Sequence, residues 1–189
     1  MVLNKLLKAF GLISDANQQL IDELHAQIVR AARQPEFYLS YGVRDDFDKR
    51  FEVFCLLCSL VLQKLHTSPH PAQDVAQDLI DAVVRHLEII LRQEGIGDVA
   101  VPKRIKKYIK SFYGRHRAYA AACALADKQA LLESLYRNLS AGIEGDKKNL
   151  FAADRMLHYV QRTISDFEGL ELVVFTDGLV PFPDPALVH

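Results

Sequence analysis

The sequence carries no excess of charge of either sign. Its 189 residues include 23 Lys and Arg against 24 Asp and Glu, which leaves a formal net charge of -1 at pH 7. This balance excludes a nucleic-acid-binding protein that is basic throughout, and it excludes a chain with a long acidic disordered tail. Half of the residues are hydrophobic, so the chain can bury the core of one globular domain.

Cysteines and long hydrophobic runs are equally scarce. The three cysteines are an odd number and do not form a disulfide framework, so we expect a reducing compartment. The longest apolar run, residues 53–62, is far shorter than the roughly 20 residues that a membrane-spanning helix needs. Residues 1–13 form a short amphipathic segment without a secretory cleavage site. These absences predict a soluble, cytoplasmic protein.

Apolar residues recur at helical spacing through most of the chain. The helix over 46–65 is apolar nearly all round, which is typical of a helix that is buried on every side. Gly114 is expected to interrupt or bend the chain between the fourth and fifth helices. The spacing predicts helices over about 15–32, 46–65, 72–94, 102–113, 118–139 and 150–168.

The end of the chain departs from this pattern. Only residues 172–175 resemble a strand, and the prolines at 181, 183 and 185 rule out a regular strand after them. No repeat and no long linker divides the chain. We therefore predict an all-α fold: a single compact multi-helix domain over 14–189 that ends in a short extended tail, preceded by the amphipathic segment 1–13.

No motif of a known kind of active site is present. His66 and His70 have the spacing of metal ligands, but a proline between them prevents a shared helix face. Cys55 and Cys58 form a CxxC pair inside the most apolar helix, so we interpret them, like Cys123, as small buried hydrophobic residues. We predict no metal ion, no cofactor and no enzymatic activity. A deep pocket with converging titratable groups would revive the enzyme hypothesis.

One segment has a strong charge bias. No acidic residue lies between Asp98 and Asp127, whereas seven residues there are basic; the rest of the chain has 16 basic and 24 acidic residues. Lys103 and Arg104 fall in the first turn of the predicted helix, where cations oppose the helix dipole, and this placement hints at an anionic partner. A solvated basic face balanced by acidic neighbouring helices explains the same charges without a partner.

The candidate partner-binding residues come from this segment. The candidates for an anionic partner are a phospholipid surface, RNA and the acidic face of a protein. Tyrosines beside the cations look exposed, and Arg and Tyr are frequent anchors of interfaces. The predicted partner-binding residues are Lys103, Lys106, Lys107, Lys110 and Arg115, with Tyr113 and Tyr119 as aromatic anchors.

Several segments resemble the ubiquinol–cytochrome c chaperone family. The most specific are the run Gly95-Ile-Gly-Asp-Val-Ala-Val-Pro-Lys103, the run Phe112-Tyr-Gly-Arg115, and Tyr119 after it. The resemblance covers about residues 30–183 and includes Tyr159-Val-Gln-Arg-Thr-Ile164 near its end. Because the sequence carries no long presequence, we expect a bacterial member of the family.

The resemblance implies a non-catalytic, all-helical assembly factor. Mitochondrial members of the family assist the biogenesis of cytochrome b in respiratory complex III, act with a small partner protein and associate with the mitochondrial ribosome. For this chain the resemblance implies cytochrome b or another complex III subunit as the client, held at the inner membrane. The ribosome, an anionic membrane surface and a small partner protein are further candidate partners. The alternative is a peripheral membrane- or RNA-binding helical module without a cytochrome b client.

Overall fold

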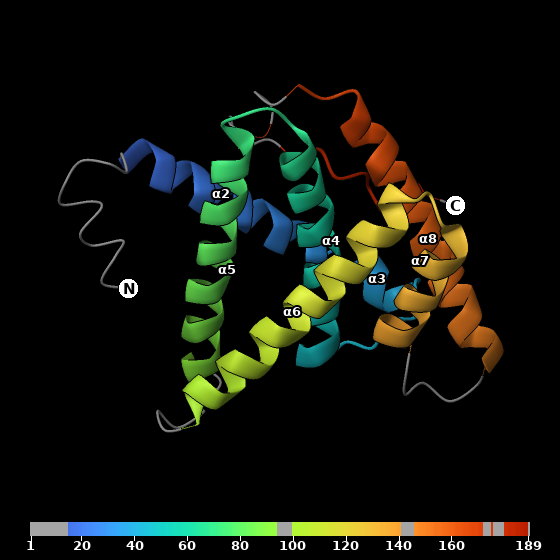
Figure 1. Cartoon of the computed structure of the whole chain (residues 1–189). Helices are drawn as coiled ribbons and strands as arrows, with labels where there is room; N and C mark the ends of the chain where they lie inside the picture. The colour runs from blue at the N-terminus through green and yellow to red at the C-terminus, as the bar shows by residue number, and fades with distance from the viewer. Residues whose placement is uncertain (1–14, 94–99, 141–145, 172–174, 176–179, 189) are drawn as a thin grey trace.

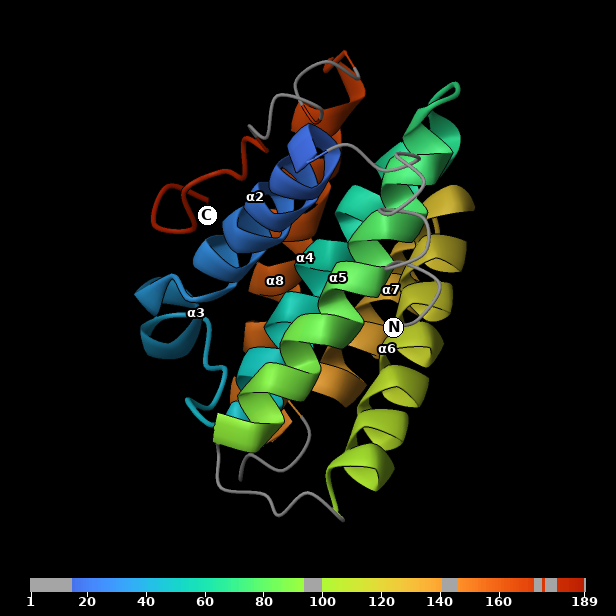
Figure 2. The same ribbon diagram turned by 90° about the vertical axis from the view of Figure 1, so that its left-hand side faces the viewer.

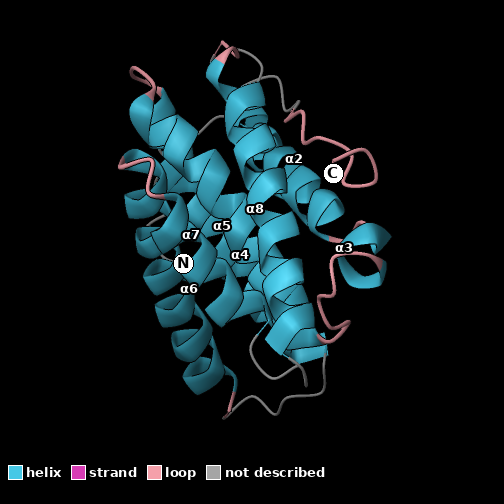
Figure 3. Cartoon of the chain, turned by 90° about the vertical axis from the view of Figure 1, so that its right-hand side faces the viewer, coloured by secondary structure: helices cyan, strands magenta, loops and turns pink. Residues whose placement is uncertain are grey.

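The computed structural model describes residues 15–93, 100–140, 146–171, 175 and 180–188 (Figure 1). Within these ranges the regular structure is entirely helical, as Figure 3 shows, which confirms the all-α prediction. The amphipathic segment 1–13 and the strand-like residues 172–174 lie outside the described ranges. The helices are α2 (Asp15–Ala32), α3 (Pro35–Leu39), α4 (Phe47–Thr67), α5 (Ala72–Gln93), α6 (Val101–Ala124), α7 (Lys128–Leu135), the π-helical turn η1 (Tyr136–Ser140) and α8 (Asp146–Glu168).

Helix α4 lies at the centre of the fold. The side chains of residues 55–62 are at most 2% exposed. Helices α2, α5, α6 and α8 all contact α4, and Figure 2 shows it enclosed among them. The structure therefore confirms the prediction that this helix, apolar nearly all round, is buried on every side. None of the described helices is long and apolar enough to cross a membrane.

The N-terminus of α4 is set by a side-chain cap. Asp46 precedes the helix, and its carboxylate accepts a hydrogen bond from the backbone N–H of Lys49 at 3.0 Å. Upstream, Pro35 begins the short helix α3 because a proline at the first helical position loses no intrahelical hydrogen bond. These two sequence features therefore determine where α3 and α4 begin.

Helix α6 differs from the expectation of a break near Gly114. A single helix runs from Val101 through Gly114 to Ala124, diagonally across α5 and α4 (Figure 1). Phe112 and Tyr119, on either side of the glycine, are buried. Their packing offsets the low helix propensity of glycine, which tertiary contacts routinely override. The prediction of two helices joined at this position was wrong.

The break instead follows α6. Ala126 adopts a positive φ of 49°, and Asp127 then caps α7 by accepting a hydrogen bond from the backbone N–H of Ala130 at 3.0 Å. The helix expected over 118–139 is therefore interrupted, and Leu125 lies at this break and is 78% exposed. An alanine in the left-handed region gives no sequence signal of the kind that glycine gives.

The C-terminal tail, residues 180–188, is held against the helical domain. The Tyr41 hydroxyl donates a hydrogen bond to the Pro185 carbonyl at 2.9 Å, and the Tyr159 hydroxyl donates one to the Pro183 carbonyl at 3.2 Å. Tyr41 and Tyr159 are both buried, and the centroids of their rings lie 6.3 Å apart. The short extended tail that the prolines predicted is thus part of the packed structure.

Replacing Gly114 with alanine should stabilise the protein. A Cβ at this position would meet no atom within 4 Å. Alanine is favoured over glycine in a helix interior by about 1 kcal/mol. We expect the free energy of unfolding of Gly114→Ala to rise by about 0.5–1 kcal/mol, measured by urea unfolding at an unchanged m-value.

Gly42→Ala is the matched control for this substitution. Gly42 has a φ of +68°, and a Cβ there would lie 3.2 Å from the Cβ of Ala152. We expect this variant to lose about 1–2 kcal/mol, because an L-residue is strained in the left-handed region. If Gly114→Ala were destabilised as well, α6 would not be a regular helix at residue 114.

Candidate partner-binding surface

The outer side of α6 carries a row of free cations. Lys103, Lys106, Lys107 and Lys110, which we call the basic face, are all exposed. None of these four side chains has an ion pair or hydrogen bond with another described residue. Tyr113 follows them and is 47% exposed. The structure therefore presents four of the predicted lysines and one predicted tyrosine together on the surface.

The opposite side of α6 is packed against α4 and α5. Phe112 is buried, and the Tyr108 ring meets the Phe51 ring edge to face at 4.9 Å. The Tyr108 hydroxyl donates a hydrogen bond to Asp48 at 2.8 Å. Burial, followed by the neighbouring Asp48 carboxylate, raises the pKa of Tyr108 to about 12. Tyr108 thus joins α6 to the first turn of α4, and α6 has an inner side packed on the core and an outer side that carries the lysines.

The first turn of α6 contains no acidic residue. Lys103 and Arg104 lie there, and the preceding Ala100 makes no side-chain cap. Asp98, the acidic residue that precedes this helix in the sequence, lies outside the described residues. A cation near a helix N-terminus is unfavourable by about 0.3–1 kcal/mol, so the local structure gains nothing from this placement.

Arg115 is turned inward instead of joining the basic face. Its guanidinium makes a bidentate ion pair with the Glu52 carboxylate of α4, whose side chain is only 10% exposed. Burial raises the pKa of Glu52 above its ordinary value, and the hydrogen bonds from Arg115 oppose that rise. Such a pair fixes the position of α6 along α4, because separating the partners would leave an unpaired charge in a buried environment.

Tyr119 is also an inner residue. It is 1% exposed, and its hydroxyl accepts a hydrogen bond from the Asn138 side chain at 3.0 Å. The ammonium group of Lys49 donates to the backbone carbonyl of the same Asn138 at 2.8 Å. The expectation that Tyr119 is an exposed anchor was wrong, since it faces the interior between α6 and η1. The side chains of Tyr119 and Arg115 therefore anchor the inner side of α6, and the basic face lies on its outer side.

Sequence reasoning missed the partners of these two residues. Glu52 and Lys49 lie at the N-terminal end of the most apolar helix, and both are buried. Charged residues are almost never buried unless they are paired, so their presence in a buried helix was an available signal. The sequence does not show which helices supply the partners of these two buried charges.

The cysteines behave as buried apolar residues. Cys55 and Cys58 are 0% exposed inside α4, and Cys123 is partly buried. Burial raises the pKa of the Cys55 and Cys58 thiols well above the ordinary range, and it raises that of Cys123 to about 11. A thiol in this state is a poor nucleophile and a poor metal ligand. The described residues contain no group of three or more His, Cys, Asp or Glu placed to hold a metal ion.

Comparisons with known proteins agree on the nature of the chain. Residues 39–180 match the family described as ubiquinol-cytochrome C chaperone. The chain is also similar to a solved structure, the Cbp3 homolog from Brucella abortus, with 30% sequence identity and a TM-score of 0.80. That similarity covers 97% of this chain and 99% of the solved chain. No curated protein matches the sequence significantly.

Removing the guanidinium of Arg115 should destabilise the fold in a pH-dependent manner. Arg115→Met leaves the Glu52 carboxylate buried without its bidentate partner. We expect a loss of about 3 kcal/mol at pH 7, the lower end of the range for breaking a buried pair, because the Arg115 side chain is 23% exposed. Protonation of Glu52 removes the buried charge, so the deficit relative to the native chain should shrink from pH 7 to pH 5.

Lys110→Met is the control on the same helix. Lys110 is exposed and has no described partner, so its substitution should change the free energy of unfolding by less than about 0.5 kcal/mol at both pH values. Chemical denaturation of both variants at the two pH values makes the comparison. An Arg115→Met variant as stable as the native chain at pH 7 would show that the pair contributes nothing.

Proposed function

Because the chain belongs to the ubiquinol–cytochrome c chaperone family, we propose that it holds cytochrome b, or another subunit of the same complex, during assembly. Family membership supports the proposed client. The observation that carries the proposal for how the chain reaches this client is the basic face: four exposed lysines without described partners, on a helix whose inner side is fixed to the core. A surface of this kind favours a binding role over catalysis. No cofactor has a part in it.

The basic face suits the membrane surface around a client better than the client itself. Cytoplasmic loops of membrane proteins carry an excess of Lys and Arg, which repels a basic surface. Anionic lipid headgroups attract one, by about 1 kcal/mol for each Lys near the surface. Tyr113, exposed beside the lysines, has the amphipathic side chain that is enriched at headgroup depth. We propose that the basic face docks on the anionic inner membrane beside the client, so that the protein is peripheral.

A second candidate function rests on the first turn of α6. Lys103 and Arg104 lie at a helix N-terminus, where unpaired N–H groups favour phosphate oxygens. The phosphates of RNA fit this arrangement as well as lipid phosphates do, which supports contact with the ribosome or another RNA. Binding to RNA and binding to vesicles both weaken with salt, so only a direct comparison of the two separates them.

The first experiment is a crosslinked pull-down of the tagged chain, probed for cytochrome b. It compares the native chain with a variant in which Lys103, Lys106, Lys107 and Lys110 are changed to Glu. We expect the native chain to recover cytochrome b and the variant to lose it. Changing the same four lysines to Arg keeps the charge and should keep the recovery. No cytochrome b with the native chain would refute this client.

Binding to vesicles tests the membrane contact separately. Vesicles that contain anionic phospholipid should bind the native chain, whereas purely zwitterionic vesicles should not. The four Lys→Glu changes should weaken this binding at least about 100-fold at low salt, given about 1 kcal/mol per removed Lys. The four Lys→Arg changes should leave it within about threefold of the native chain. Salt-insensitive binding, or tighter binding to an RNA of equal charge, would contradict the membrane contact.

A further inference from the structure

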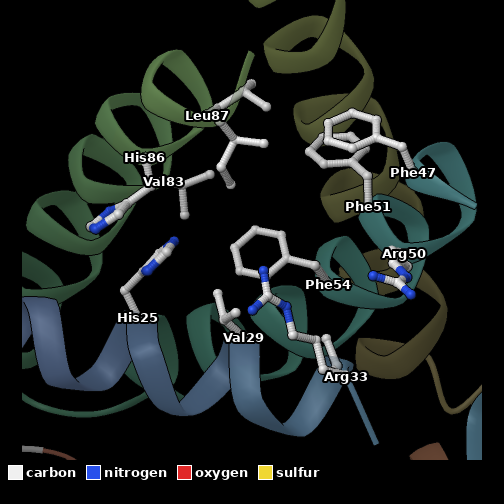
Figure 4. Close-up of a pocket in the computed structure, with 12 residues that line it drawn as sticks. His25, Val29, Arg33, Phe47, Arg50, Phe51, Phe54, Val83, His86 and Leu87 are labelled. Atoms are coloured by element: carbon white, nitrogen blue, oxygen red, sulfur yellow. The ribbon is translucent and has the colours of Figure 1, made fainter. Parts of the chain in front are cut away.

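A second surface feature lies between α2, α4 and α5. It is a cavity of about 180 Å³ that opens to solvent on one side. Eight of its twelve lining residues are apolar. Figure 4 shows the rings of Phe47, Phe51 and Phe54 from α4 turned toward the same space as Val83 and Leu87 from α5. The three phenylalanines follow one another at intervals of four and three, which places them on one face of α4.

The size of the cavity limits what it can hold. An apolar cavity of roughly 150 Å³ holds one molecule of benzene. A space of about 180 Å³ therefore accepts one bulky apolar group, such as a leucine or phenylalanine side chain, but not a long acyl chain. Because the cavity is open on one side, an isolated small molecule would remain partly in water, whereas a protein segment that carries such a side chain would cover the mouth.

The lining of the cavity contains basic residues but no acidic ones. None of the lining residues is acidic, and Arg33 and Arg50 both line it. Arg50 is already paired with Asp45 at 2.5 Å. The side chain of Arg33 is exposed and has no ion pair or hydrogen bond with another described residue. Its charge is therefore available to a carboxylate that arrives with the occupant.

The remaining polar residues of the lining are His25 and His86. The rings of His25 and His86 are stacked with their centroids 4.0 Å apart (Figure 4). Burial, followed by the charge of His86, lowers the pKa of His25 to about 4, so His25 is neutral at pH 7. The His86 ring makes a 3.0 Å hydrogen bond with the backbone carbonyl of Ala82. The stacked rings thus add a flat aromatic surface to the lining, and Arg33 and Arg50 are its two guanidinium groups.

We propose that this cavity is a docking pocket for a partner protein, which inserts one aromatic or branched apolar side chain and places a neighbouring carboxylate on Arg33. Charge complementarity and the size of the cavity carry this inference, which does not depend on the identity of the client proposed above. The pocket adjoins the inner side of α6, because Phe47 and Phe51 both contact the Tyr108 ring of that helix.

Two pairs of matched probes test the pocket on the full chain by NMR. The first pair is 4-phenylbutyrate and 4-phenylbutylamine, which share the phenyl group and differ in the sign of charge. The second pair consists of helical peptides that carry one Phe flanked by either Glu or Lys. We expect the carboxylate and the Glu peptide to shift the signals of Phe54, Val83 and Leu87 saturably, and each oppositely charged partner to bind at least tenfold more weakly.

Variants assign the binding to the pocket. Arg33→Glu should weaken the Glu peptide at least tenfold, whereas Arg117→Glu, at an exposed arginine of α6, should leave it unchanged. Val83→Trp should abolish binding by filling the cavity, and the Arg33 variant keeps the test decisive if that protein does not fold. Replacing the peptide Phe with Ala should remove the shifts.

Four outcomes would overturn the proposal. Failure of both the carboxylate and the Glu peptide to bind shows that the cavity is not a receptor for this chemistry. Binding of the small carboxylate without the peptide assigns the cavity to a small molecule. Nuclear Overhauser effects between Phe54 and residues 1–14 in the free chain identify a segment of this chain as the occupant. A dimer that Val83→Trp disrupts in sedimentation identifies a second copy of the chain.

Discussion

The burial of α4 is the constraint on which the other elements depend. A helix whose residues 55–62 are at most 2% exposed needs apolar cover on every side, and α2, α5, α6 and α8 supply it. The surrounding elements must also supply polar partners for the two charged side chains of α4 that are buried. Glu52 receives Arg115 from α6, and Lys49 receives the Asn138 carbonyl from η1. The position of α6 therefore follows from the polar groups of α4 as much as from its apolar ones.

This division of labour explains why the cations of α6 have different roles. Arg115 lies on the side of the helix that meets Glu52, and it contributes to the fold. The lysines of the basic face lie on the opposite side and contribute no contact within the described structure. Two tyrosines of α6 differ in the same way: the side chain of Tyr113 is 47% exposed on the outer side, and that of Tyr119 is only 1% exposed. The charge bias of one segment is thus the sum of a structural part and a part available to partners.

Helical spacing predicted the long helices well, because their apolar residues repeat without interruption. The bounds of α5 agree with the expected range to within a residue, and α4 ends two residues later than expected. The errors come from residues whose conformation is decided by distant contacts. Gly114 is a helix breaker by propensity, yet packing at Phe112 and Tyr119 carries the helix through it, and the chain turns at Ala126 instead.

The candidate site was predictable only in part for a related reason. A helical wheel separates an outer from an inner side, which was enough to place the four lysines on the surface. It does not show that a neighbouring helix supplies a buried carboxylate to Arg115. The cavity beside α4 was equally hidden, because Phe47, Phe51 and Phe54 have the spacing of an ordinary core face. Only the packing of α2 and α5 shows that these rings are left partly uncovered.

The rigid attachment of α6 has a consequence for the speed of association. Exposed charges attract a partner over about 8 Å at physiological ionic strength, and they act mainly on the rate at which partners meet. The lifetime of a complex is set instead by the groups that become buried. Because the helix that carries the lysines is held in one orientation by its inner side, it needs no rearrangement on contact. For the membrane docking that we propose, the charged helix would therefore govern how quickly the surface is found, and the groups that become buried would govern how long the contact lasts.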